Sequence, residues 1–139
     1  MLRERSLLER LADPRPEATR TTHQNEALLV ASILDHLGKM LNTRRGNAPV
    51  ALDYGIPDMA DMVHSFPEAI RAMEQAIRAT IEKYEPRLTN IRVRHSGSGQ
   101  EEVFSVHFDI TATIVPTASR KSVSFRTRVD SSGEFEIRE

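Results

Sequence analysis

Apolar residues recur at three- and four-residue steps along two segments of the chain, a spacing typical of one buried helix face. The first segment runs from about Thr22 to Leu41, with Thr22 as its expected N-cap. The second stripe ends near Tyr84 and contains Ile70, Met73, Ile77 and Ile81. The pattern therefore predicts two long amphipathic helices. The predicted core face of the first one consists of Ala27, Val30, Ala31, Leu34, Leu37 and Leu41.

The start of the second helix is indicated by the sequence Ser65-Phe66-Pro67-Glu68. Ser65 and Glu68 have the spacing of a capping box, and a proline between them is tolerated in the first helical turn. The loop before it, NTRRGNAPVALDYGIPD (42–58), is rich in the Gly, Asn and Pro residues of turns. Within this loop we expect Val50 and Leu52 to point inward, because both side chains are apolar.

From Leu88 onward the period of the pattern changes from about 3.6 to 2, which is typical of strands. The segments 103–115 and 122–129 alternate most regularly, and shorter ones surround Ile91 and Ile137. Helices that precede strands joined by short turns favour an α+β fold. We predict amino-terminal helices packed on one face of a carboxy-terminal antiparallel sheet, whose other face is polar.

The amino-terminal segment is expected to be an arm separate from the main domain. Leu7, Leu8 and Leu11 lie on one side of a short predicted helix, which Asp13-Pro14-Arg15-Pro16 ends. An isolated helix of this length is marginal in water, so its leucines need the main domain or a partner. Both alternatives stay open. We divide the chain into an arm over residues 1–20 and a single α+β domain over residues 21–139.

Composition narrows the possible functions. The 139 residues have a net charge of −1 and only 5% aromatic residues, so neither bulk charge nor aromatic stacking favours nucleic acid. No cysteine is present, which excludes disulfides and thiolate chemistry and suits a reducing cytoplasm. The polar start of the sequence is unlike a signal peptide, and no apolar run has the length of a membrane span. We expect a cytoplasmic protein without membrane insertion.

Candidate catalytic and metal-binding residues do not form a recognisable set. The five histidines lack metal-ligand spacing and are expected in surface or filler positions, and no nucleophile or phosphate-binding motif occurs. Asp53, Asp58, Asp61 and Glu85 are the candidate carboxylates for a glycosidase. Their spacing selects no pair of opposed acid and base. We therefore expect no catalytic site, no cofactor and no metal, and keep a glycosidase as the alternative.

Basic residues are concentrated in the predicted sheet. Arg120, Lys121, Arg126 and Arg128 lie in one segment, and Arg92 and Arg94 lie on another strand. Such residues often form a solvated face, but they also suit a basic surface that binds an acidic protein partner. We choose 122–129 as the exposed edge strand, because Arg126 and Arg128 would protect such an edge.

The tripeptide Glu85-Pro86-Arg87 follows the second helix directly and has an unusual combination of charges for a connector. A carboxylate at the carboxyl end of a helix meets the negative end of the helix dipole, which costs about 1 kcal/mol or less. An exposed local ion pair would return little stability. The alternative is a rigid polar clamp in which Glu85 accepts hydrogen bonds from a partner and Arg87 donates a planar fork to it.

Several of these segments together resemble the TssE subunits of type VI secretion baseplates. They are the SLLERL arm, the NTRRG loop (42–46), the YGIPD segment (54–58) and YEPRL (84–88), followed by the alternating strands. TssE belongs to a baseplate wedge family shared with contractile phages and formerly labelled lysozyme-like. The resemblance covers nearly the whole chain, and Glu-Pro-Arg is its most specific element.

The resemblance implies a structural role in a bacterial cytoplasmic baseplate that is docked to a membrane. Glu85, Pro86 and Arg87 would bind the wedge core formed by TssF and TssG, in a complex that also contains TssK. The sheet would provide a platform for assembly of the contractile sheath of TssB and TssC. With 122–129 chosen as the edge strand, we place Arg126 and Arg128 at that contact. A generic adaptor domain that uses its edge strand is a further alternative.

Overall fold

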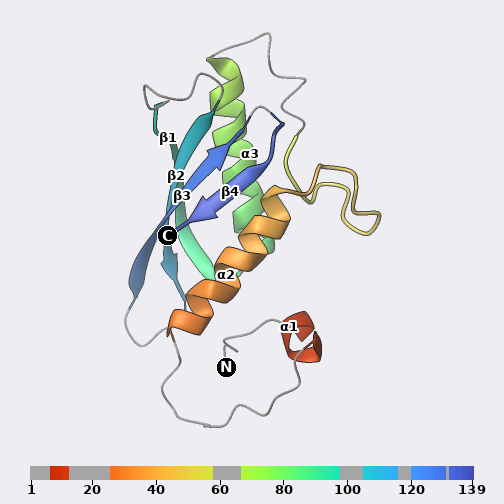
Figure 1. The fold of residues 1–139 in the computed structure, drawn as a ribbon, viewed down its shortest axis with the longest axis vertical. Helices are drawn as coiled ribbons and strands as arrows, with labels where there is room; N and C mark the ends of the chain where they lie inside the picture. Colours follow the sequence, from red (N-terminus) through yellow and green to blue (C-terminus); the bar gives the residue numbers. More distant parts are fainter. Residues whose placement is uncertain (1–6, 13–25, 58–66, 98–104, 116–119, 131) are drawn as a thin grey trace.

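The computed structural model describes residues 7–12, 26–57, 67–97, 105–115, 120–130 and 132–139 (Figure 1). Three helices come first within these ranges: α1 (Leu7–Ala12), α2 (Glu26–Leu41) and α3 (Glu68–Tyr84). Four described strands follow in one antiparallel sheet of order β1-β2-β3-β4. They are β1 (Leu88–His95), β2 (Val106–Ile114), β3 (Lys121–Val129) and β4 (Phe135–Arg138). The predicted α+β class, with helices before an antiparallel sheet, is confirmed.

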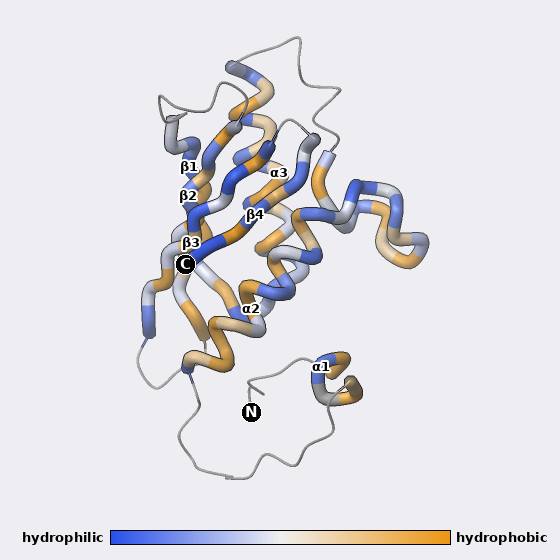
Figure 2. Tube along the Cα trace, in the orientation of Figure 1, coloured by the Kyte–Doolittle hydropathy of each residue, from blue (hydrophilic) through white to orange (hydrophobic). Residues whose placement is uncertain are grey.

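The domain has two layers, because buried and exposed positions alternate along the strands. On β3 the buried residues are Val123, Phe125, Thr127 and Val129, and the residues between them are more exposed. Figure 2 shows the matching alternation of hydrophobic and hydrophilic residues along the sheet. Only one sheet face is therefore apolar, and α3 packs on it against β1 while α2 packs against β4. The other face is polar, as the sequence predicted.

A bulge in β1 keeps its apolar residues on the buried face. Register shifts between Thr89 and Arg92, where Asn90 adopts a positive φ of 52°. Asparagine tolerates this left-handed conformation better than most residues. The extra residue lets Leu88 and Ile91, three positions apart, both face the core.

The core face of α2 differs from the prediction. Ala27 and Ala31 are exposed and Leu34 is half-buried. The helix is apolar around most of its circumference, so its spacing did not select one face. Larger side chains gain more from burial than alanine does, and they decide the orientation. The buried apolar residues of α2 are Leu29, Val30, Ile33, Leu37, Met40 and Leu41.

The loop before α3 does not point its apolar residues inward as expected. Val50 and Leu52 are 101% and 70% exposed, because their loop projects away from the domain as the yellow segment of Figure 1. Helix α3 begins at Glu68, directly after Pro67, and ends at Tyr84 as predicted. The expected caps Thr22 and Ser65 lie outside the described residues.

The choice of 122–129 as an edge strand was wrong for Arg126–Val129, which β4 covers, and only the Lys121–Phe125 part of β3 lacks a described strand on that side. Strand β3 pairs with β2 along its whole length and with β4 from Arg126 to Val129. Among the described strands, β1 and β4 are at the edges. Alternation identifies the faces of a strand but not its neighbours, and a tight turn at Asp130 returns the chain onto β3. In that turn Gly133 donates to the carbonyl of Asp130 at 3.0 Å.

Candidate functional site

The Glu85-Pro86-Arg87 segment forms a compact turn between α3 and β1. The N–H of Glu85 donates to Ile81 O at 2.9 Å and closes the helix, and the N–H of Leu88 donates to Glu85 O at 3.1 Å. The carbonyl of Arg87 accepts from Val115 N at 2.9 Å, which ties the turn to the end of β2. Pro86 is exposed, whereas the two charged residues on either side of it are buried. The backbone thus turns two opposite charges inward.

Glu85 and Arg87 bind each other through two parallel hydrogen bonds. Nε of Arg87 donates to Oε1 of Glu85 and Nη2 donates to Oε2, each at 2.7 Å. The backbone N–H of Arg87 donates to the same Oε1 at 3.2 Å. The two residues are only 1% and 8% exposed, respectively. A planar fork on a carboxylate is the strongest form of ion pair available to protein side chains.

Residues of α2 and α1 extend this pair into a network. Nδ1 of His36 lies 2.8 Å from Oε2 of Glu85, and because a carboxylate only accepts, the ring N–H donates. Nη1 of Arg87 donates to the hydroxyl of Ser32 at 2.9 Å, and this hydroxyl donates to Glu9 of α1 at 2.9 Å. Four side chains and Glu9 therefore connect the turn, α2 and α1.

The electrostatics of the network favour an ionised Glu85. Burial by itself would raise the pKa of this carboxyl group, but hydrogen bonds from Arg87 and His36 outweigh burial. They lower the pKa of Glu85 to about 2. The carboxylate is therefore charged at neutral pH, and its charge is compensated within the chain. Breaking such a buried pair by removing one partner typically costs about 3–5 kcal/mol.

The structure shows which parts of the proposed clamp a partner could reach. The donors of Arg87 already contact Glu85 and Ser32 inside the chain. The part of the tripeptide that reaches solvent is Pro86. A partner at this turn would contact Pro86, whose position depends on the buried Glu85–Arg87 pair. Whether Glu85, Pro86 and Arg87 bind a partner stays a prediction.

Ser32, His36 and Glu9 were not predicted as site residues. His36 was expected in a surface or filler position, yet it is half-buried and binds Glu85. The signal available in the sequence is the i, i+4 spacing of Ser32 and His36 within a largely apolar helix. Polar residues at that spacing share one helix face, and each requires a hydrogen-bond partner when it is buried.

The α1 leucines do not pack on the domain. Leu7, Leu8 and Leu11 are 62%, 76% and 70% exposed. Helix α1 contacts α2 through a polar hydrogen bond, which the Ser32 hydroxyl donates to Glu9. Of the two alternatives for these leucines, the structure removes burial against the chain's own domain.

Of the candidate glycosidase carboxylates, the two that the structure describes, Asp53 and Glu85, lack the properties of a catalytic pair. Oδ1 of Asp53 accepts from the Tyr84 hydroxyl at 2.5 Å, and Lys83 also contacts this carboxylate. Hydrogen bonds from Lys83 and Tyr84 lower the pKa of Asp53 to about 2. The pKa of Glu85 is lowered as well, whereas a catalytic acid needs a raised one. Asp58 and Asp61 lie outside the described residues.

The two loop motifs NTRRG and YGIPD pair with each other. Arg45 N donates to Ile56 O, and Ile56 N donates to Thr43 O, each at 3.0 Å. Gly55 has a φ of 100°, and a Cβ there would lie 2.1 Å from Thr43 O, so only glycine fits. The two motifs, which residues 47–53 separate in the sequence, therefore form one structural unit.

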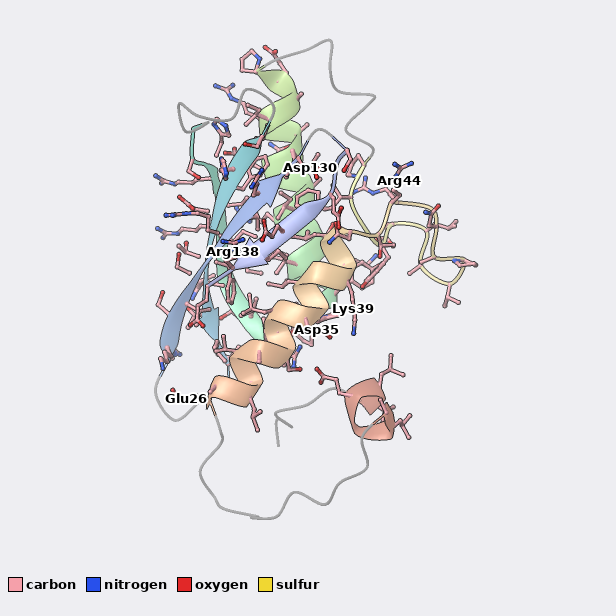
Figure 3. The ribbon with its side chains drawn as sticks, viewed as in Figure 1. Glu26, Asp35, Lys39, Arg44, Asp130 and Arg138 are labelled. Carbon is pink, nitrogen blue, oxygen red and sulfur yellow. The ribbon has the colours of Figure 1, made fainter. Side chains whose placement is uncertain are left out.

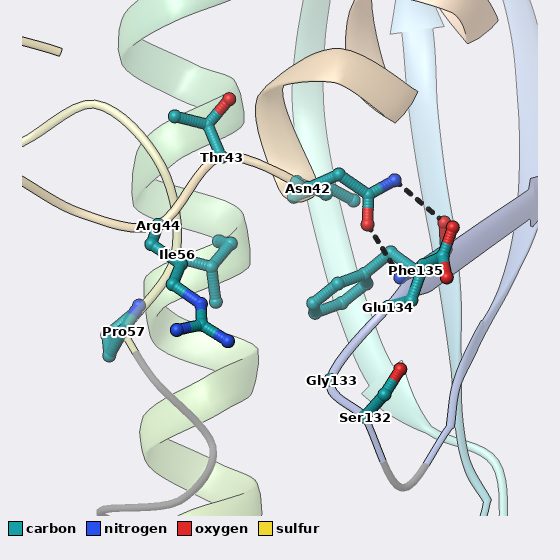
Figure 4. A pocket seen from close by; sticks show the side chains of 10 residues that line it. Asn42, Thr43, Arg44, Ile56, Pro57, Ser132, Gly133, Glu134 and Phe135 are labelled. Carbon is teal, nitrogen blue, oxygen red and sulfur yellow. Dashed lines mark hydrogen bonds between the residues drawn. The ribbon is translucent and has the colours of Figure 1, made fainter. Parts of the chain in front are cut away.

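This loop unit faces β4 across an open cavity of about 340 Å³ (Figure 4). Asn42 lies at its rim and covers part of the β4 edge. Its Nδ2 donates to Phe135 O at 2.9 Å, and its Oδ1 accepts from Phe135 N at 2.8 Å. The side chain therefore occupies the positions that a neighbouring strand would take at Phe135.

The predicted contact residues Arg126 and Arg128 lie on the polar face of the sheet. Arg126 Nε donates to Asp109 Oδ1 of the neighbouring strand at 3.2 Å, and Arg128 is half-buried. Lys121 pairs with Glu26 at 2.7 Å and ties β3 to the start of α2. The basic residues of β3 therefore differ in burial and in their partners, and they do not form one uniform basic surface.

Across the described ranges, no three or more His, Asp or Glu side chains are grouped to hold a metal ion. In the same part of the chain, no helix has the length and apolarity needed to cross a bilayer.

Fold and site together define a small α+β structural domain, with a buried polar network at its helix-to-strand junction. The family model of the baseplate wedge protein gp25 matches residues 27–119, and the chain belongs to this family. A chain of a solved structure titled "The baseplate complex from the type VI secretion system" has a similar fold. It matches with a TM-score of 0.59 and 20% identity, over 76% of this chain and 97% of its own. No curated protein sequence matches significantly.

Proposed function

We propose that this protein is a non-enzymatic structural subunit of a type VI secretion baseplate, located in the bacterial cytoplasm at a membrane-docked assembly. The observation that carries the proposal is the baseplate wedge family match over 27–119, which includes Glu85-Pro86-Arg87 and β1–β2. The similarity in fold to a chain of a type VI baseplate complex agrees with it. The lowered pKa values of Asp53 and Glu85 disfavour the lysozyme-like alternative.

The proposed contact with the wedge core of TssF and TssG, in a complex with TssK, is the turn at Glu85-Pro86-Arg87. The buried ion pair holds this turn in one conformation and leaves Pro86 exposed. The same network reaches Glu9 of α1 through Ser32, so the exposed leucine face of α1 is tied to this region. The turn and α1 are thus one candidate surface.

The proposed contact with sheath subunits TssB and TssC is the sheet edge formed by β4 and the uncovered half of β3. Phe135 turns its backbone groups toward Asn42 and therefore away from β3. Hydrogen-bonded and non-hydrogen-bonded pairs alternate in an antiparallel ladder. The backbone N–H and C=O of Arg126 therefore point toward β4, and those of Ser124 point in the same direction beyond the end of β4. No described strand pairs with β3 there. An incoming strand finds unpaired N–H and C=O groups at Ser124 and Ser122, with the Arg126 and Arg128 side chains close by.

The experiment that tests the proposal is affinity purification of the tagged full chain from cells that express a type VI system. We expect baseplate and sheath subunits among the proteins identified by mass spectrometry. In parallel, the purified protein is expected to leave a peptidoglycan gel uncleared. Clearing that Asp53→Asn or Glu85→Gln abolishes, together with the absence of baseplate subunits, would overturn the proposal in favour of the glycosidase.

A further inference from the structure

The sheet face that points away from the helices, here called the outer face, concentrates positive charge. Five arginines lie at outward positions: Arg92 and Arg94 of β1, Arg126 and Arg128 of β3, and Arg138 of β4. The acidic residues on this face are Asp109 and Glu136. In Figure 3 nitrogen-tipped side chains extend from the strands away from α2 and α3.

These charges contrast with the rest of the chain. Among the described strand residues, five arginines and two acids give the outer face a charge of 5 − 2 = +3, while the whole chain has −1. The strand register places Arg94, Asp109, Arg126 and Arg138 side by side in one row across the sheet. Neighbouring strands are about 4.8 Å apart, so the row is one continuous electrostatic surface.

The arginines of this face differ in their partners. Arg126 pairs with Asp109 at 3.2 Å, and Arg138 contacts Glu136 of its own strand. Arg92 and Arg94 are exposed, and within the described part of the chain neither forms an ion pair or side-chain hydrogen bond. They follow each other at i and i+2, about 6.8 Å apart along β1. The uncompensated charge of the face is therefore greatest on β1.

We infer that Arg92 and Arg94 on β1 form a docking surface for an acidic segment of another protein. This rests on the proposed function, because it adds a contact to a structural subunit. This surface differs from the proposed sheath contact, because β1 is at one edge of the sheet and the β3–β4 edge is at the opposite one.

The composition of the outer face selects protein over other polyanions. A continuous phosphate backbone would meet Asp109 and Glu136, and like charges at a contact are costly. A protein segment places its carboxylates opposite the arginines alone. The described outward positions of β2 and β3 are Thr, Ser, His, Asp and Arg, so no aromatic ring there stacks on bases and no apolar side chain inserts into a bilayer.

The spacing of the two arginines defines a probe. In an extended peptide, side chains at i and i+2 point to one side and are about 6.8 Å apart. A dodecapeptide of alternating Glu and Ser therefore presents carboxylates at the spacing of Arg92 and Arg94. Binding of the fluorescein-labelled peptide to the full chain is measured by anisotropy at low and high salt. A short DNA duplex and vesicles containing phosphatidylserine are measured alongside it.

We expect the peptide to bind at low salt, more tightly than the duplex or the vesicles, and to be released by high salt. Arg92→Glu/Arg94→Glu should weaken peptide binding by about tenfold or more, and Arg92→Gln/Arg94→Gln by less. The matched control is Arg71→Glu/Arg78→Glu on α3, which changes the net charge equally at two exposed positions. The control should change binding by less than about twofold.

The inference is overturned by equal losses in both Glu double variants, by no binding of the peptide, or by tighter binding of the duplex or the vesicles. Melting curves establish that the variants are folded, and the Gln double variant serves if the Glu one is not. The peptide assay uses the isolated protein, so a negative result there does not change the recovery of baseplate subunits by affinity purification. A failure to recover baseplate subunits likewise leaves the peptide-binding result unchanged.

Discussion

At the scale of single residues, the buried Glu85–Arg87 pair links local backbone to the rest of the domain. Its two charges are 1% and 8% exposed, and together they make contacts with Ser32 and His36 of α2. Removing either partner leaves the other charge buried without the opposite charge that it pairs with. The pair is consequently a source of rigidity at the turn whether or not a partner binds there.

Arg87→Ala is expected to lower the free energy of unfolding by about 3–5 kcal/mol, because Glu85 would stay buried and charged. Urea denaturation of the purified chain measures this loss. The matched control is Arg78→Ala, which removes one member of the exposed Arg78–Glu82 pair and should cost about 1 kcal/mol or less. Glu85→Gln/Arg87→Met removes both charges and should be more stable than Arg87→Ala. Equal stability of Arg87→Ala and the wild type would contradict a buried pair.

The lowered pKa of Glu85 also predicts a pH dependence. The folded value is about 2 and the reference value 4.5, so the contribution of this group is complete above pH 4.5. It is lost as the pH falls from 4.5 toward 2, because the unfolded chain takes up the proton first. The size of the effect is about 3 kcal/mol. Urea denaturation at several pH values in this window should show a steeper loss for the wild type than for Glu85→Gln. Parallel slopes would show that Glu85 has an ordinary pKa when folded.

At the scale of secondary-structure elements, short β4 determines which part of the sheet edge is covered. It pairs with β3 only from Arg126 to Val129, so the Lys121–Phe125 half of β3 has no described strand on that side. The α2 carboxyl end contributes Asn42, which satisfies both backbone groups of Phe135. Exposed edges invite pairing with other chains, and Asn42 limits this at one position.

Asn42→Ala should expose the Phe135 backbone and loosen β4. Each lost hydrogen bond contributes about 0.5–1.5 kcal/mol, so the expected destabilisation is about 1–3 kcal/mol. Hydrogen exchange of the Phe135 amide should accelerate more than exchange of the Phe125 amide in β3. Asn47→Ala, at an exposed loop residue, is the control and should leave both rates unchanged. Unchanged exchange at Phe135 in Asn42→Ala would show that another group covers this edge.

At the scale of the whole molecule, one sheet has three different surfaces. Its inner face packs on α2 and α3, the described residues of its outer face have a charge of +3, and at its β3–β4 edge no described strand pairs with Lys121–Phe125. A baseplate subunit that binds several partners requires separate surfaces, because each contact must form without displacing another. The arrangement of charges and edges in this domain meets that requirement.

Ser124→Pro tests the edge in a cell that carries the secretion system. The backbone N–H of Ser124 points away from β2. Proline at this position therefore removes an N–H from the uncovered edge and leaves the β2–β3 ladder intact. We expect baseplate recruitment to persist while fewer fluorescent sheaths form. Ser124→Thr retains the N–H and should behave as the wild type. Normal sheath numbers with Ser124→Pro would remove this half of β3 from the proposed contact.

Much of the fold was accessible from spacing alone. The ends of α2 at Leu41 and of α3 at Tyr84, and the alternation in β2 and β3, are properties of residues close together in the chain. Glycine, proline and charge patterns at the turns are local in the same sense. For this reason the α+β class could be predicted and Glu85-Pro86-Arg87 could be singled out, while its role in binding a partner stays a prediction.

Long-range packing decided the remaining features. The partners of the Glu85–Arg87 pair, His36 and Ser32, are 49 and 55 residues away, and no local pattern specifies which groups meet across that distance. The buried face of α2 depended on which side chains filled the space against β4, and the position of β3 inside the sheet depended on where β4 folded back. Periodicity reports which face of an element is apolar, whereas neighbours are chosen by the free energy of the whole packed domain.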